Sequence, residues 1–136
     1  MKKVVAFLAL TALVLQACNT PEKLLVRQWK LIDVEFNEKE YNITLADKPE
    51  MVKQLRDSCL FIFYKDHTYS FKLPQRTEVG TWEFSRSKDT IFTKTEHGGA
   101  ASKVNVLSKI ALDVDSYAGN ASKIHYVLAP VVNVAK

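Results

Sequence analysis

A change to period-two alternation after residue 59 constrains the fold of this chain more than any other feature. From Leu60 onward, short apolar stretches alternate with polar residues and are separated by turn residues at nearly regular intervals. This spacing is typical of antiparallel strands joined by short connections, each with one face toward a core. Together with an earlier apolar stretch, the expected strands are residues 24–36, 60–64, 69–73, 79–85, 90–95, 104–107, 110–114 and 124–128. The chain is therefore predicted to be all-β.

Closure of these strands into a barrel is the simplest architecture, because a closed sheet has no exposed edges that attract other strands. We expect an eight-stranded antiparallel up-and-down barrel, with a two-sheet sandwich as the alternative. The apolar phase shifts near Leu31, which predicts a bulge in the first strand. Gly80 lies inside a strand, where a glycine permits a bend or a close approach. The glycine-rich segment 97–102 is expected to be a loop.

One helix is expected between the first and second strands, over residues 47–58. Asp47 is placed to cap it, Pro49 lies in the first turn, and Glu50 follows three residues after the cap. Apolar residues then recur at helical spacing on one face, namely Met51, Val52, Leu55 and Cys59. Because this face is short, we interpret the helix as closing one end of the barrel rather than binding a membrane or a partner.

The first eighteen residues indicate export. Lys2 and Lys3 precede an apolar segment over residues 4–17, which is the layout of a secretory signal peptide. The segment is too short for a hydrocarbon core of about 30 Å, which needs on the order of 20 residues. It ends Leu15-Gln16-Ala17-Cys18, which resembles the lipobox of bacterial lipoproteins.

The lipobox resemblance implies that the Cys18 thiol takes a diacylglyceryl group, that the chain is cut just before it, and that the new amino terminus is acylated. Three acyl chains would hold the protein on a membrane. The predicted organisation is a signal peptide over residues 1–17, a lipidated tether over 18–23 and a barrel domain over 24–136. An ordinary signal peptide with an incidental cysteine is the alternative.

Composition argues against several classes of function. The 19 basic and 15 acidic side chains are nearly balanced once the signal lysines are removed, so no nucleic-acid stripe is expected. With Cys18 lipidated, only Cys59 remains, and we interpret it as a small buried hydrophobe rather than a reactive thiol.

Chemistry-bearing motifs are few. The three histidines, His67, His97 and His125, have no cysteine or carboxylate at metal-ligand spacing, so neither a metal nor another cofactor is expected. The carboxylates Glu78, Glu83 and Asp113 could face one another in a barrel, but outward charged faces are the ordinary explanation. No nucleophile elbow or phosphate loop is present, and an enzyme is not predicted.

Three short motifs resemble those of the lipocalin-like lipoproteins common in Bacteroidetes. They are Trp29-Lys30-Leu31, Phe63-Tyr64-Lys65-Asp66-His67-Thr68-Tyr69 and Gly80-Thr81-Trp82-Glu83-Phe84. In that family an early tryptophan opens the barrel, a turn resembling aspartate-glycine-threonine joins two strands, and a glycine-x-tryptophan strand follows. His67 stands where that turn usually has glycine, which adds local strain. The resemblance implies an eight-stranded calyx that can hold one small hydrophobic molecule.

Two functions from different classes follow. The first is a membrane-anchored envelope lipoprotein whose barrel binds a fatty acid, a lipid or another apolar molecule. Its expected lining is Trp29, Phe71, Trp82, Phe84 and Tyr126. An eight-stranded barrel is only wide enough for side chains or for one small ligand. The second function is therefore a structural or protein-interaction lipoprotein with a filled barrel, such as an envelope accessory subunit or an enzyme inhibitor acting through segment 97–102.

Two further expectations concern location and modification. Asn19 is not the acidic second residue that marks inner-membrane retention in enteric bacteria, so we expect outer-membrane anchorage facing the periplasm. Asp89-Thr90-Ile91 resembles the short glycosylation site used on exported proteins of Bacteroidetes, which makes Thr90 the candidate acceptor.

Overall fold

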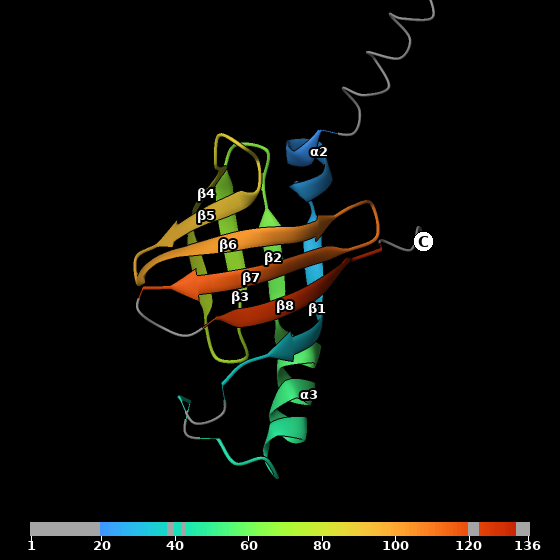
Figure 1. Ribbon diagram of the computed structural model, residues 1–136, viewed down its shortest axis with the longest axis vertical. Helices are drawn as coiled ribbons and strands as arrows, with labels where there is room; N and C mark the ends of the chain where they lie inside the picture. The colour runs from blue at the N-terminus through green and yellow to red at the C-terminus, as the bar shows by residue number, and fades with distance from the viewer. Residues whose placement is uncertain (1–19, 38–39, 42, 120–122, 133–136) are drawn as a thin grey trace, which may run out of the picture.

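The computed structural model describes residues 20–37, 40–41, 43–119 and 123–132, which form a closed antiparallel barrel of eight strands (Figure 1). The strands follow one another around the barrel in chain order, and β1 pairs with β8. The expected up-and-down barrel is confirmed, and the sandwich is excluded. The strands are β1 (Gln28–Glu35), β2 (Leu60–Phe63), β3 (Thr68–Lys72), β4 (Thr77–Phe84), β5 (Thr90–Thr95), β6 (Gly98–Leu107), β7 (Leu112–Ala118) and β8 (Ile124–Pro130).

A short helix that was not predicted, α2 (Pro21–Leu25), precedes the first strand. Thr20 is its N-cap, and the Thr20 side chain accepts a hydrogen bond from the backbone N–H of Lys23 at 3.4 Å. The prediction of a strand from residue 24 is wrong over residues 24–27, because the capped turn with proline in its first position continues to Leu25. Leu25 is fully buried, so α2 packs into the barrel.

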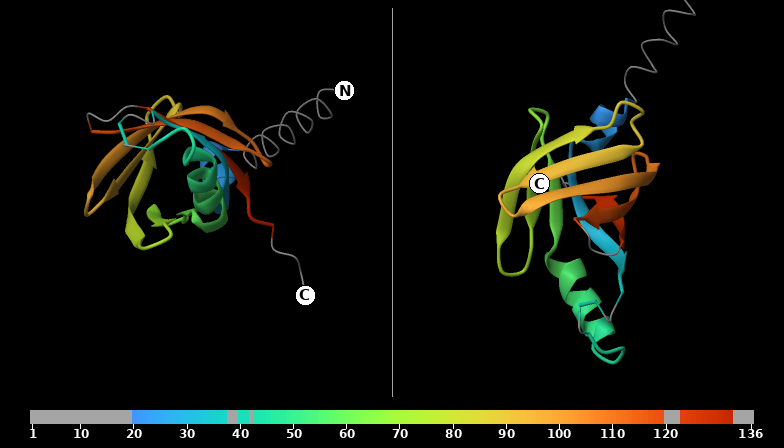
Figure 2. Two further views of the ribbon diagram at one scale, coloured as in Figure 1. Left: turned by 90° about the horizontal axis from the view of Figure 1, so that it is seen from below. Right: turned by 60° about the vertical axis from the view of Figure 1, so that its left-hand side comes forward.

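The predicted helix is confirmed as α3 (Lys48–Ser58), and Figure 1 places it at the end of the barrel opposite α2. Seen along the barrel from that end, α3 lies over one side of it (Figure 2, left). Val52 and Leu55 pack against the core. The expected side-chain cap is absent, because Asp47 Oδ2 accepts from Thr44 Oγ1 at 2.6 Å instead.

The bulge predicted in the first strand is confirmed. The register between β1 and β8 shifts between Leu31 and Asp33. The extra residue restores the inward phase, so Trp29, Leu31 and Val34 are all buried.

The loop predicted over residues 97–102 is wrong. β6 begins at Gly98, where Gly98 pairs with Thr95 of β5, and only a two-residue turn remains between these strands. Gly98 has a φ of 126°, which glycine adopts at little steric cost. The chain from 115 to 123 was also expected to be a loop, yet β7 continues to Ala118. Conversely, the expected strand start at Ile110 is wrong: Ile110 is exposed and β7 begins at Leu112.

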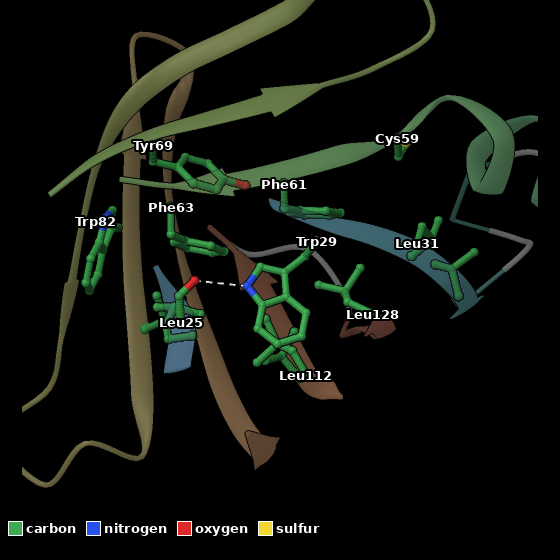
Figure 3. Packing of buried hydrophobic residues seen from close by; sticks show 13 residues of the cluster. Leu25, Trp29, Leu31, Cys59, Phe61, Phe63, Tyr69, Trp82, Leu112 and Leu128 are labelled. Carbon is green, nitrogen blue, oxygen red and sulfur yellow. Dashed lines mark hydrogen bonds between the residues drawn. The ribbon is translucent and has the colours of Figure 1, made fainter. Parts of the chain in front are cut away.

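One hydrophobic core cluster joins the interior of the barrel to Leu25 of α2 (Figure 3). Trp29 lies at its centre with no exposed surface, and its indole Nε1–H donates to the backbone oxygen of Leu25 at 2.9 Å. The Arg27 guanidinium lies 5.4 Å from the centroid of the Trp29 ring. Packing of Leu25 and the buried hydrogen bond from Trp29 hold helix α2 against the barrel. This helix closes the end of the barrel opposite α3.

Candidate functional site

The interior of the barrel contains a cavity of about 310 Å³. Its lining includes Glu78 at the start of β4, Thr95 at the end of β5 and Ala118 at the end of β7. These strand ends lie away from α2, so the cavity reaches the α3 end of the barrel. Phe63, Ile91 and Leu112 lie at the strand ends nearer α2, and they line the inner end of the cavity.

One wall of the cavity is aromatic and comes from β2, β3 and β8. The Phe61 and Phe71 rings are stacked, with centroids 4.4 Å apart, and Tyr126 meets Phe61 edge-on at 5.4 Å. Phe63 and Tyr69 extend this wall, with ring centroids 5.1 Å apart. Alternation along each strand directs these rings inward, so the aromatic wall follows directly from the period-two sequence.

On the opposite side, β5 and β7 contribute Ile91, Leu112 and Val114. The rest of this wall is a set of small side chains from β5, β6 and β7, namely Thr93, Thr95, Ala100, Ser102, Ser116 and Ala118. Ser102 Oγ donates to Ser116 Oγ at 3.0 Å, which satisfies one of these hydroxyls within the wall. Because small residues face large rings across the barrel, the interior is not filled, and this asymmetry is the physical origin of the cavity.

An ion pair lies among the lining residues. Arg76 Nη2 is 3.1 Å from Glu78 Oε1, and the Glu78 side chain is 14% exposed while that of Arg76 is 60% exposed. The carboxylate is thus the inner partner and the guanidinium the outer one. Each charge largely neutralises the other at this position.

Two tyrosine hydroxyls face the cavity without a partner. Tyr69 and Tyr126 both line it, and among the described residues neither hydroxyl forms a hydrogen bond. No fully buried side-chain oxygen or nitrogen of these residues is unpaired, so both hydroxyls are accessible from the cavity. Burial raises the pKa of both hydroxyls far above the usual value, and nearby ionisable groups raise the pKa of each further. Both groups therefore stay protonated at physiological pH and remain hydrogen-bond donors.

Of the five residues predicted to line the ligand cavity, two line it and three do not. Phe71 and Tyr126 line the cavity, and they also line a smaller apolar chamber of about 140 Å³ beneath α3. Trp29, Trp82 and Phe84 lie in the closed half and are not among the cavity-lining residues. Cys18 lies outside the described residues.

Trp82 has a structural environment of its own. Its Nε1–H donates to the backbone oxygen of Tyr64 at 2.9 Å, and its ring stacks on His67 with centroids 4.4 Å apart. His67 has a φ of 69°, so its backbone is left-handed, a conformation that glycine adopts more easily than histidine. The stacking and a 3.1 Å contact of His67 Nδ1 with the Trp82 carbonyl oxygen oppose that strain.

The buried cysteine fits its predicted role. Cys59 is 5% exposed, follows α3 and contributes to the apolar chamber beneath that helix. Burial raises the pKa of its thiol, which disfavours the reactive thiolate.

The three carboxylates that a barrel could have gathered do not face one another. Glu78 lines the cavity, Glu83 lines an outer groove and Asp113 lies on the outer face beside His125. Within residues 20–37, 40–41, 43–119 and 123–132, no group of three histidine, cysteine or acidic side chains is placed to hold a metal ion. The outer contact between Asp113 Oδ1 and His125 Nε2 is short, at 2.6 Å.

This outer carboxylate predicts a pH dependence of stability. Burial acts to raise the pKa of Asp113, but hydrogen bonds from Asn105 and His125 and the histidine charge outweigh it, so the pKa lies below its usual value. A depressed carboxyl pKa stabilises the fold above the unfolded value of about 4, and this contribution is lost as pH falls through the folded pKa. Thermal melts between pH 6 and pH 2 should show a smaller acid-side decrease for Asp113→Asn than for the unmodified protein. Asp115→Asn, on the same strand, is the control that should leave the decrease unchanged.

Thr90 begins β5 beside a turn, where Asp89 Oδ1 accepts hydrogen bonds from the hydroxyls of Ser85, Ser87 and Thr90. Its glycosylation stays a prediction, which an intact mass without a glycan increment would contradict.

The fold and its interior define a class of protein: a lipocalin-like up-and-down barrel of eight strands with one partly filled end and one cavity-bearing end. No protein-family model, curated protein or solved structure matches this chain. In the part of the chain that the structure describes, no helix has the length and apolar character needed to cross a membrane.

Proposed function

We propose that this protein is a lipid-anchored envelope lipoprotein of the lipocalin-like family whose barrel binds a small, largely apolar molecule. The observation that carries the proposal is the cavity of about 310 Å³ between an aromatic wall and a wall of small residues. Its volume lies at the lower end of the range of about 300–1,000 Å³ that holds small ligands. A barrel filled by its own side chains would leave no such space, so the cavity favours binding over the filled alternative.

The proposed anchor fixes the orientation of the barrel. Cys18 is three residues before Pro21, where α2 begins, and α2 closes the end of the barrel opposite the cavity. Three residues span at most about 10 Å even when fully extended. The closed end would therefore lie at the membrane surface and the cavity would face away from it. The ligand would then enter from the aqueous side, in keeping with a domain exposed to the periplasm.

Binding can be tested with a variant that fills the cavity. Ala100 lies in the small-residue wall, so Ala100→Phe places a ring in the empty space. We expect the purified protein to retain a small apolar molecule, detected by native mass spectrometry and organic extraction, and to bind the fluorescent probe N-phenyl-1-naphthylamine. Ala100→Phe should reduce probe affinity by at least tenfold.

The neighbouring substitution Ala101→Phe is the matched control, since Ala101 lines the outer groove instead. It should bind the probe as the unmodified protein does. Equal binding by Ala100→Phe would place the probe elsewhere on the molecule, and a stable protein that neither carries a molecule nor binds the probe would contradict the proposed function.

A second candidate function, protein interaction, is favoured by one feature of the outer surface. Phe92 and Tyr117 pair with Ala101 from either side, and both rings line an outer groove with 43% and 45% of their surface exposed. Affinity capture that returns one stoichiometric protein, lost in Phe92→Ala but kept in Ala100→Phe, would favour this function. The inhibitory loop expected at 97–102 gives it no support, because that segment lies mostly in a strand.

A further inference from the structure

We infer that the barrel takes a compact, neutral ring compound carrying a hydrogen-bond-accepting oxygen, such as a ketone, rather than a fatty acid or a long-chain lipid. This inference rests on the proposed binding function and names the class of its ligand. Three properties of the cavity support it: two unpaired hydroxyl donors, an internally neutralised charge pair, and a small volume bounded by stacked rings.

The hydroxyl donors specify an acceptor. Tyr69 is 6% exposed and Tyr126 is partly buried. Both line the cavity, and neither hydroxyl has a hydrogen-bond partner among the described residues. The Tyr69 hydroxyl points toward Phe61, which also lines the cavity (Figure 3). Both hydroxyls therefore belong to residues of one cavity wall. Among the described residues no fully buried side-chain oxygen or nitrogen lacks a partner, so these unpaired hydroxyls are accessible from the cavity, and a ligand oxygen there would accept a hydrogen bond from them.

The charge arrangement favours a neutral ligand. Glu78 is the inner, more buried member of the pair with Arg76. A fatty-acid carboxylate inside the cavity would approach a second carboxylate, and the guanidinium that could attract it is already bound 3.1 Å from Glu78. An ammonium group would likewise compete with Arg76 for Glu78. A carbonyl oxygen needs neither charge and accepts directly from a tyrosine hydroxyl.

The volume and wall shape favour a compact ring. A volume of about 310 Å³ lies at the lower end of the range of about 300–1,000 Å³ for small-ligand cavities, so it favours a compact molecule over a long acyl chain. The Phe61 and Phe71 rings are stacked on one another, with an angle of 23° between their planes, so a ligand ring would extend this stack. Flat rings stack on one another with ring centroids about 4.5–7 Å apart. The small-residue wall opposite leaves room for one such ring system.

Three probes of known chemistry separate the possible ligand classes. Calorimetric titration of the purified protein with 2-acetylnaphthalene, 2-ethylnaphthalene and decanoate compares a ring ketone, the same ring without the oxygen, and a fatty acid. We expect 2-acetylnaphthalene to bind at least tenfold more tightly than either of the others. Ala100→Phe should abolish this binding, because it fills the same cavity.

Two conservative variants test the hydroxyls directly. Tyr69→Phe and Tyr126→Phe remove one oxygen each and no protein hydrogen bond, so the unfolding midpoint should not fall. Each should weaken 2-acetylnaphthalene binding about fivefold to tenfold, as expected for one neutral hydrogen bond, and leave 2-ethylnaphthalene binding unchanged. Tyr117→Phe, on the outer face, is the control that should change neither.

The outcomes distinguish this inference from the proposed function. Tighter binding of decanoate, equal binding of the two naphthalenes, or ketone binding insensitive to both tyrosine variants would overturn the inference while the cavity remained a binding site. If none of the probes binds and no molecule is extracted from the protein, the inference and the proposed function both fail.

Discussion

Gly80→Ala should destabilise the protein by about 3 kcal/mol or more, a severe effect for the addition of one methyl group. A Cβ at position 80 would lie 1.7 Å from the backbone oxygen of Lys94 on the neighbouring strand β5. That oxygen belongs to the backbone of a paired strand, so it cannot move away without breaking the register in which Gly80 lies opposite Thr95. The effect should appear as a lower midpoint of urea unfolding, or as failure to fold.

Gly99→Ala is the matched control, because Gly99 lies in β6, which pairs with the opposite edge of β5. Position 99 pairs with Lys94, and a Cβ there would lie 3.3 Å from the backbone oxygen of Thr93, a distance that a small shift relieves. We expect a change within about 1 kcal/mol, because alanine is also favoured over glycine in a strand by roughly 0.5–1 kcal/mol. A Gly80→Ala protein as stable as Gly99→Ala would mean that β4 and β5 do not approach so closely.

Much of the fold could be predicted because a half-buried strand must alternate. The strands, the connecting turns and α3 all follow from periodicity and turn residues that lie close together in the sequence. Even the bulge at Leu31 was visible, since an extra residue shifts the apolar phase within one strand. Helix α2 was missed although Thr20 and Pro21 mark its start, because its five residues are too few to show helical periodicity.

The segment after His97 shows where local propensity fails. Two glycines and two alanines predict a loop, because none of them has a side chain that favours a strand. In the barrel, Ala100 pairs with Thr93 on one side and Ala118 on the other, so hydrogen bonds to both neighbours fix the strand. The same absence of large side chains leaves the cavity open. The small residues at 98–101 therefore explain both why β6 was not predicted there and why the barrel has room for a cavity.

The sequence predicts which residues point into the barrel, but it does not predict how far along the barrel axis each of them lies. Alternation correctly identified inward aromatic residues, but it carries no information on how far along the barrel axis each one lies. That depth depends on pairings between distant segments, such as Trp29 with Pro130 and Phe71 with Glu78. Phe71 was therefore correctly placed at the cavity, while Trp29 belongs to the closed end.

Trp29→Ala should destabilise the protein by about 3–5 kcal/mol, the range observed when a large buried aromatic side chain is removed. The indole has no exposed surface and contacts the centre of the core beneath α2. Its removal leaves a void and also deprives the Leu25 carbonyl oxygen of its 2.9 Å hydrogen bond. Urea unfolding followed by circular dichroism would measure the change. Phe92→Ala removes a half-exposed ring from the outer face, and it should lower the free energy of unfolding by less than about 1 kcal/mol.

Trp29→Phe separates the structural role of this residue from a role in ligand contact. The smaller ring keeps most of the packing but cannot donate to Leu25, so we expect a loss of about 1–3 kcal/mol from the lost bond and the reduced volume. Because Trp29 does not line the cavity, affinity for 2-acetylnaphthalene should stay within twofold of the unmodified value. If affinity instead fell with stability barely changed, Trp29 would be a ligand contact and the cavity would extend to the closed end. If stability alone falls, α2 and the first strand form a rigid closed end, and recognition is confined to the cavity that Tyr69 and Tyr126 line.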